Sequence, residues 1–309
     1  MAKILKSTFI IVKKVVNLSI SPLLLTILIA LGSLFIDAEQ NTILAFVLIL
    51  TVGLLHGSND LLIIKKVGNL EYANRKVFLK TISAYLFSIG VILLAFYFYK
   101  AYVLLFFILI SSYHFGQQHL ASKWNGFSSL KVMAYVCYGL GIFGMIFATH
   151  SESSAKVISA ITNYEATREA FQWLAIGSLL VFFGLSLGNK SMGAKAYLIE
   201  AVLLLVLLGV FLITDLLLSF ALYFAFWHAL PSLSDQIKLL YNQPLRKGIV
   251  SYVRSSYLYW AISAIAFIAL LMVLDVQDLQ VIELLVYFLA AITFPHVMVM
   301  SRIERLLET

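Results

Sequence analysis

Five histidines lie inside apolar stretches of this sequence, where an ionisable side chain is costly and marks a functional site by default. They are His56, His114, His119, His228 and His296, and the sixth histidine, His150, stands beside Ser151 and Glu152 at the end of an apolar stretch. Neutral imidazole can hold iron, copper or zinc without burying a net negative charge. The residue type therefore favours a metal site, with a proton relay or ion path and plain interhelical packing as the alternatives.

The neighbours of two histidines indicate how such a site would be built. Asp60 follows His56 by one helical turn, so its carboxylate could orient the His56 ring toward a metal, although a simple hydrogen bond within the helix is the structural alternative. His114 and His119 are five residues apart, which is about 140° around a helix, so both cannot easily face one metal. We prefer His114 as the ligand and place His119 in a second shell or at the cytoplasmic edge.

The composition indicates that lipid surrounds most of the chain. Hydrophobic residues make up 62% of the 309 residues and charged residues 12%, far from the mix of soluble domains. Apolar runs near the length needed to cross a bilayer recur, and none alternates as a barrel strand would. We predict an all-α, polytopic integral membrane protein in which residues 1–309 form a single transmembrane domain. The expected helices are about ten, at 20–36, 42–63, 81–99, 102–121, 130–149, 172–188, 194–213, 216–232, 257–274 and 279–300.

Successive connections between the expected spans are alternately rich and poor in lysine and arginine, which predicts the topology. The net charge of +7 comes mainly from the rich connections, so it is a topology signal and nucleic acid is not an expected partner. By the positive-inside rule both termini are cytoplasmic, in a multi-pass protein of the plasma (inner) membrane. Residues 1–19 carry four lysines and are expected to form a basic, amphipathic cytoplasmic segment on the membrane surface.

The five histidines share one depth in this arrangement. All fall in even-numbered spans, roughly 12 to 17 residues from the outer ends, or roughly 18–26 Å into a core of about 30 Å. A zinc metalloprotease would have His-Glu-x-x-His, which does not occur in this sequence. A membrane di-iron desaturase or hydroxylase would need about eight clustered histidines, and this chain has six. The one cysteine, Cys137, cannot form a thiolate cluster. A mononuclear site is favoured, in which four imidazoles around ferrous iron, Fe(2+), leave positions for dioxygen.

Four patches resemble the Brp/Blh family of membrane-bound β-carotene dioxygenases. They are His56-Gly57 with Asp60, Tyr113-His114-Phe115-Gly116, Trp227-His228 and Pro295-His296, in that order along the chain. The resemblance implies cleavage of the central 15,15' double bond of β-carotene by O2 and non-haem iron, giving two retinal molecules. Some members have another histidine one turn after the Trp-His pair, where this chain has Ser232. His296 is then the deep histidine that completes four with His56, His114 and His228, and His119 is the reserve.

The implied substrate suits a membrane enzyme, because a C40 hydrocarbon dissolves in the bilayer and can enter between helices. Aromatic residues beside the histidines would line a tunnel for the polyene, although ordinary packing is as good a reading for each one. These residues are Tyr113, Phe115, Tyr223, Phe226, Trp227 and Phe294. The resemblance also allows a retinal-accepting rhodopsin as a partner.

Two other classes of protein compete with this enzyme hypothesis. A transporter of protons or divalent metal would need polar residues reaching both membrane faces, yet the outer halves of the histidine-bearing spans hold few beyond Ser219 and Glu283. An assembly factor for a retinal-binding partner would make the histidines incidental.

Overall fold

Helices make up nearly all of the residues that the computed structural model describes, which are 20–67, 75–124, 129–187, 193–242, 245–274 and 278–308. None of these described residues forms a strand, as predicted. The predicted surface segment 1–19 lies outside them. In chain order the elements are α2 (Ile20–Gly32), η1 (Ser33–Phe35), α3 (Ala38–Leu48), η2 (Ile49–Gly53), α4 (Asp60–Val67), α5 (Arg75–Leu120), η4 (Ala121–Lys123), α6 (Ser129–Thr149), α7 (Ser151–Thr162), α8 (Arg168–Leu187), α9 (Ala194–Ile213), α10 (Leu216–Leu222), η5 (Tyr223–Ala229), α11 (Leu230–Tyr241), α12 (Leu245–Leu274) and α13 (Asp278–Glu308).

Seven helices among the described residues are long and apolar enough to cross a membrane. Two further apolar helices, Pro22–Phe35 and Ala38–Gly53, are shorter than the others. The expected number of about ten spans is therefore not confirmed, although the helices of a membrane protein are present. The expected outer connection at 150–171 contains an additional amphipathic helix, α7.

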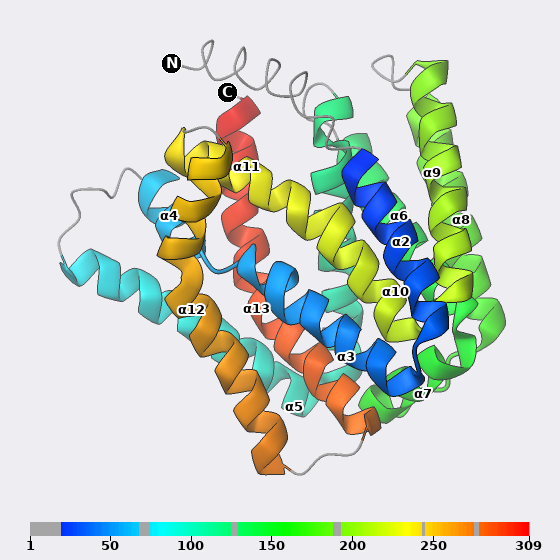
Figure 1. Cartoon of the computed structure of the whole chain (residues 1–309), viewed down its shortest axis with the longest axis horizontal. Helices are drawn as coiled ribbons and strands as arrows, with labels where there is room; N and C mark the ends of the chain where they lie inside the picture. The colour runs from blue at the N-terminus through cyan, green and yellow to red at the C-terminus, as the bar shows by residue number, and fades with distance from the viewer. Residues whose placement is uncertain are drawn as a thin grey trace.

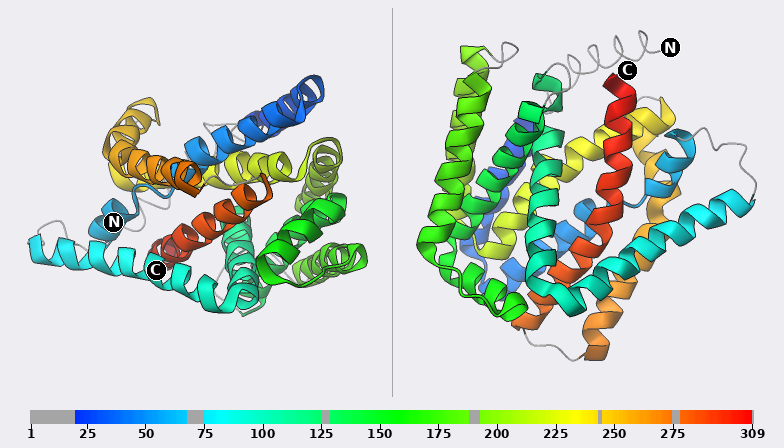
Figure 2. Two further views of the ribbon diagram at one scale, coloured as in Figure 1. Left: turned by 90° about the horizontal axis from the view of Figure 1, so that it is seen from below. Right: turned by 180° about the vertical axis from the view of Figure 1, so that it is seen from behind.

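The first difference from the predicted spans lies in α5, which joins the two expected at 81–99 and 102–121. At about 1.5 Å per residue its 46 residues would measure more than twice a hydrocarbon core of about 30 Å. The helix bends at Tyr99, whose φ of −136° and ψ of 45° are not helical, next to Lys100. Its first part runs obliquely along one flank and its second part stands within the bundle (Figure 2).

The other long helices form a bundle with α13 near its middle (Figures 1 and 2). Glycines allow α6 to approach both of its neighbours closely. A Cβ at Gly139 would overlap the backbone of Ser112 in α5, and one at Gly144 would lie 2.5 Å from the backbone of Ala175 in α8. Tyr135 and Tyr138 are fully buried in the core that these contacts form.

Two segments depart from α-helical geometry where they pass each other. These are the π-helical segments η2 and η5, and each continues directly from an α-helix, α3 and α10 respectively. A Cβ at Gly53 would overlap the ring of Phe224, so glycine lets the two segments lie side by side. Such single-turn π segments occur frequently at functional sites.

Candidate metal centre and adjoining pocket

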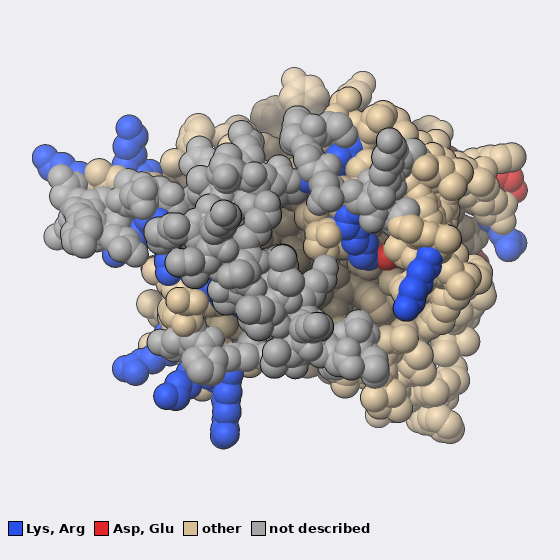
Figure 3. All heavy atoms as spheres, turned by 90° about the horizontal axis from the view of Figure 1, so that it is seen from above, with Lys and Arg blue, Asp and Glu red and all other residues tan. Residues whose placement is uncertain are grey.

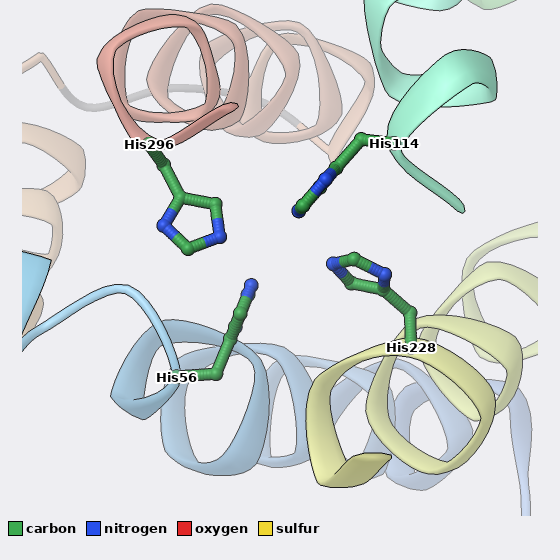
Figure 4. A group of neighbouring side chains, drawn as sticks. All are labelled: His56, His114, His228 and His296. Atoms are coloured by element: carbon green, nitrogen blue, oxygen red, sulfur yellow. The ribbon is translucent and has the colours of Figure 1, made fainter. Parts of the chain in front are cut away.

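Four histidines from four parts of the chain point toward one another at the middle of the bundle (Figure 4). They are His56, His114, His228 and His296, and a ring nitrogen from each lies within 4.8 Å of one from every other. The ring centroids of His56 and His296 are 4.7 Å apart, and those of His114 and His228 are 4.6 Å apart. Each residue is at most 5% exposed. The structure thus brings together the four histidines that the sequence singled out.

His56 and His228 owe their positions to the two π-helical segments. His56 comes just after η2, where the helix opens into the turn 56–59 before α4 begins. His228 lies inside η5, and Pro231 follows in the first turn of α11. Proline removes an amide donor and crowds the carbonyl four residues earlier, which favours a local widening of the helix. The helix around His228 is accordingly widened into the π-helical segment η5.

His114 and His296 lie on continuous helices. His114 lies on α5, two residues before Gly116, where a Cβ would overlap the backbone of Tyr135 in α6. The glycine beside His114 therefore makes room for a neighbouring helix. Pro295 precedes His296 inside α13, which continues to Glu308. The proline does not end the helix.

Asp60 contacts a different histidine from the one predicted. Its two carboxylate oxygens accept from His296 Nδ1 at 2.9 and 3.0 Å, and Oδ2 also accepts from the Tyr85 hydroxyl at 2.8 Å. His56 Nδ1 instead donates to the carbonyl of Gly53. The expected pairing of His56 with Asp60 assumed a regular helix, and the turn at 56–59 breaks that spacing. Asp60 thus orients His296.

Ring nitrogens of the four histidines that lack a hydrogen-bond partner show whether these residues could hold a metal. Among the described residues no hydrogen-bond partner is found for Nδ1 of His228 or for Nε2 of His296, and His114 has none outside its own helix, where Gln117 lies one turn away. Buried polar atoms nearly always have a hydrogen-bond partner, so several buried nitrogens without one in the same place need an explanation. Lone pairs converging from neutral imidazoles are the donor set that iron, copper or zinc requires. The residues present therefore fit a bound transition metal.

His119 does not belong to this group and is not in a second shell around it. Its Nε2 is 2.7 Å from Glu200 Oε2 on α9, and its ring stacks on Tyr138 with centroids 4.7 Å apart. Lys123 forms an ion pair with the same carboxylate. Because His119 is five residues from His114, it faces another side of α5, and its place as reserve ligand is corrected. Glu200 was the missed partner, a lone acid inside the apolar run of α9.

His150 also lies elsewhere, at the N-terminus of α7. Its Nε2 is 2.7 Å from the carbonyl of Thr214, and its Nδ1 is 2.9 Å from the carbonyl of Ile146. His150 thus contacts the end of α6 and the end of α9.

A cavity of about 320 Å³ adjoins the four histidines, which form part of its wall. The rest of the wall is mainly apolar, with a few polar groups such as Ser111, Ser263 and Thr293. Its larger apolar and aromatic side chains are Ile82, Tyr85, Leu86, Ile89, Phe107, Phe115, Phe143, Phe220, Phe224, Tyr259, Ile262, Leu289 and Ile292. A mostly apolar pocket with few polar groups is typical of a site for an apolar small molecule.

Only Phe115 of the six predicted substrate residues lines this cavity. Tyr113, Tyr223, Phe226, Trp227 and Phe294 do not line it, which corrects the prediction. Trp227 donates a hydrogen bond to Thr26 Oγ1 of α2. Phe294 lies against Phe106, with their ring centroids 5.7 Å apart.

Closeness to a histidine in sequence does not decide which side chains line the cavity, because successive residues point about 100° apart around a helix. Four of the missed residues lie three, four, seven or eight positions before a histidine, on its side of the helix. Ser111 and Phe107 precede His114 in this way, and Phe224 and Phe220 precede His228. Helical spacing counted from each histidine is the signal that could have found them.

Comparison with known proteins extends this description. A family model described as beta-carotene 15,15'-dioxygenase matches residues 47–304, which is more than four-fifths of the chain and includes all four histidines. The resemblance drawn from the four sequence patches is confirmed by this match. No curated protein and no solved structure matches the chain.

Proposed function

Because the chain belongs to the beta-carotene 15,15'-dioxygenase family, we propose that it is a membrane-bound enzyme that cleaves the central double bond of β-carotene with O2. The reaction breaks one carbon–carbon double bond, places one oxygen atom on each new end and yields two retinal molecules. Both oxygen atoms come from O2, so no further reductant is needed.

The observation that carries this proposal is the meeting of four neutral imidazoles with an apolar cavity. His56, His114, His228 and His296 would hold the metal, for which we propose ferrous iron. When bound, iron would supply the activation of dioxygen that the protein side chains cannot provide. The four rings already converge, with one nitrogen of each within 4.8 Å of one from every other, which supports a metal held between them.

Two acceptors keep the rings in the required orientation. The carboxylate of Asp60 accepts from His296 Nδ1, and the carbonyl of Gly53 accepts from His56 Nδ1. In each ring the proton is held on Nδ1, so the lone pair on Nε2 faces the centre. The Tyr85 hydroxyl donates to Asp60 and limits its movement.

The position of the cavity supports delivery of the substrate from lipid. Its lining includes Leu86 of α5 and Ile262 of α12, which are 60% and 57% exposed. A carotene dissolved in the bilayer can reach the histidines between these helices without crossing water. We propose that retinal leaves into the membrane in the same way, where a retinal-binding membrane protein such as a rhodopsin could accept it.

Purified protein in detergent tests the proposal directly. With Fe(2+), O2 and β-carotene it should bleach the polyene and release about two retinal molecules per carotene, and chelation of iron should stop the reaction. His228→Ala should also abolish the product, because Ser232 on the next turn is a poor ligand for iron and already accepts from Gln236.

A matched control and a competing outcome complete the test. His150→Ala changes a histidine outside the cavity and should leave retinal formation intact. The proposal would fail if iron-loaded protein left carotene untouched while proteoliposomes showed histidine-dependent flux of protons or metal, in which case a transporter would replace it.

A further inference from the structure

The cavity beside the histidines has two unlike ends. One end opens between α5 and α12, where Leu86, Tyr259 and Ile262 are 38–60% exposed. The other end lies against α6 and α10, where ring contacts lead from His228 through Phe224 to Phe220. Its wall consists of Phe115, Phe143, Phe220 and Phe224, which we call the aromatic end; three of them are at most 8% exposed and Phe220 is half-buried.

Stacked aromatic rings line the aromatic end on two sides. The rings of Phe220 and Phe224 lie 5.5 Å apart at 12°, and Phe224 continues to the ring of His228 at 5.8 Å and 13°. From the facing helices, Phe115 and Phe143 stack at 5.5 Å and 12°. Across the cavity the rings are tilted, by 37° between Phe115 and Phe224 and by 25° between Phe143 and Phe220, and together they form an apolar aromatic surface for a conjugated molecule. The wall therefore leads from the histidines along a slot suited to a polyene.

Protein closes this slot beyond Phe143. Phe143 contacts Phe147 at 5.7 Å, and Phe147 contacts Phe171 of α8 at 5.6 Å. Phe143 also meets Phe220 across the slot, with ring centroids 6.4 Å apart. A substrate that enters from the lipid side would thus meet Phe143 and Phe220 after it has passed the histidines.

The depth of the slot is comparable with half of a long carotene. The two ring steps from His228 to Phe224 and from Phe224 to Phe220 measure 5.8 and 5.5 Å between centroids, so together they reach at most about 11 Å. A symmetric carotene whose leading ring stops at Phe143 and Phe220 would have its trailing half toward the lipid opening. Where it stops decides which double bond lies beside the histidines.

From this geometry we propose that Phe143 and Phe220 are specificity residues that set the position of cleavage by stopping the leading end of the carotene. This inference rests on the proposed function and deepens it. Cleavage at any double bond follows the same balance, in which the bond breaks and O2 gives one oxygen atom to each aldehyde. Central cleavage gives two equal aldehydes, and a carotene that slides deeper gives one longer and one shorter aldehyde.

Phe143→Ala and Phe220→Ala test this by lengthening the slot. The ratio of central to off-centre cleavage, measured by chromatography of the aldehydes, should fall by about 10-fold or more, as for other changes in pocket contacts. Phe143→Leu provides a milder variant if the alanine protein does not fold. Phe182→Ala is the matched control, because Phe182 is equally buried but does not line the cavity, and it should give retinal alone.

Binding by metal-free protein separates the outcomes. Wild type and variants should retain β-carotene through gel filtration, as seen from its visible absorption. Retinal as the sole product of variants that bind and cleave carotene would overturn this inference alone. A wild-type protein that binds carotene but forms no aldehyde with iron and O2 would overturn the proposed function, and this inference with it.

Discussion

Asp60 acts on the candidate metal centre from outside the four histidines. It reaches His296 from the start of α4, on a segment 236 residues earlier in the chain, and it is 2% exposed. A buried carboxylate requires partners, and the His296 ring and the Tyr85 hydroxyl satisfy it. The same bonds that stabilise the carboxylate therefore fix the ring of a candidate ligand.

We predict that Asp60→Asn keeps the protein folded but lowers its iron affinity or turnover by about 10–100-fold, the usual effect of losing such a partner. An amide is a weaker acceptor than a carboxylate, so it holds the His296 ring less firmly. Iron retained after dialysis against graded chelator measures the affinity. Tyr85→Phe, which removes only the supporting bond, should have a smaller effect.

Asp235→Asn is the matched control. Asp235 accepts hydrogen bonds from Gln118 and Lys238, and no bond among the described residues joins it to the four histidines. Its iron retention should equal that of wild type. Equal retention in Asp60→Asn would instead assign Asp60 a purely structural role.

The residue types of the centre could be predicted from sequence, whereas their contacts could not. Histidine is rare in apolar spans, so His56, His114, His228 and His296 were visible without a structure. Which side chain faces which depends on local geometry, and the turn after His56 redirects Asp60 to His296.

At the scale of elements, close packing between α5 and α6 decides where His114 lies. Gly116 of α5 faces the backbone of Tyr135, and Gly139 of α6 faces the backbone of Ser112, so the two helices touch through their main chains on both sides. Backbone atoms cannot move aside as a flexible side chain can. A methyl group at either position must therefore separate the helices.

We predict that Gly116→Ala destabilises the protein by about 1–3 kcal/mol, the usual cost of overpacking, and weakens iron binding because His114 moves with α5. The midpoint of thermal unfolding in detergent and the iron retained after dialysis are the measurements. Gly90→Ala is the control on the same helix, since a Cβ there has no atom within 4 Å. It should leave iron binding unchanged and stabilise the helix by up to about 1 kcal/mol. Equal stability of the two variants would contradict this account of the α5–α6 contact.

The sequence predicted some helices to within a few residues but did not predict the local distortions within others. The spans expected at 130–149 and 194–213 agree with α6 and α9. Hydropathy measures how apolar a segment is, so it cannot detect the π-helical segments η2 and η5 or the turn at 56–59. These distortions form where helices pack against one another around the histidines, which a single segment does not encode.

At the scale of the whole molecule, charge differs between the two ends of the bundle. Lysine and arginine gather on the face seen in Figure 3, where few acidic residues appear. Lys65 and Lys66 end α4, Lys123 ends η4 and Lys238 lies in the last turn of α11. At the opposite end, acids begin helices, with Asp37 and Asp215 as N-caps of α3 and α10 and Glu152 in the first turn of α7. Acids at helix N-termini also interact favourably with the helix dipole.

From this asymmetry we predict that the basic end faces the cytoplasm, because lysine and arginine are retained there during insertion. Single cysteines in a Cys137→Ser background test the orientation, at Ser153→Cys in α7 and Lys65→Cys in α4, both at exposed positions near opposite ends (Figure 1). A membrane-impermeant maleimide should label Ser153→Cys on intact cells and Lys65→Cys only after the membrane is opened. The reverse pattern would invert the topology, and labelling of both on intact cells would contradict a bundle that crosses the membrane. Because the cavity opens sideways between α5 and α12, carotene should be cleaved equally well in either orientation of reconstituted protein, so this result bears on topology alone.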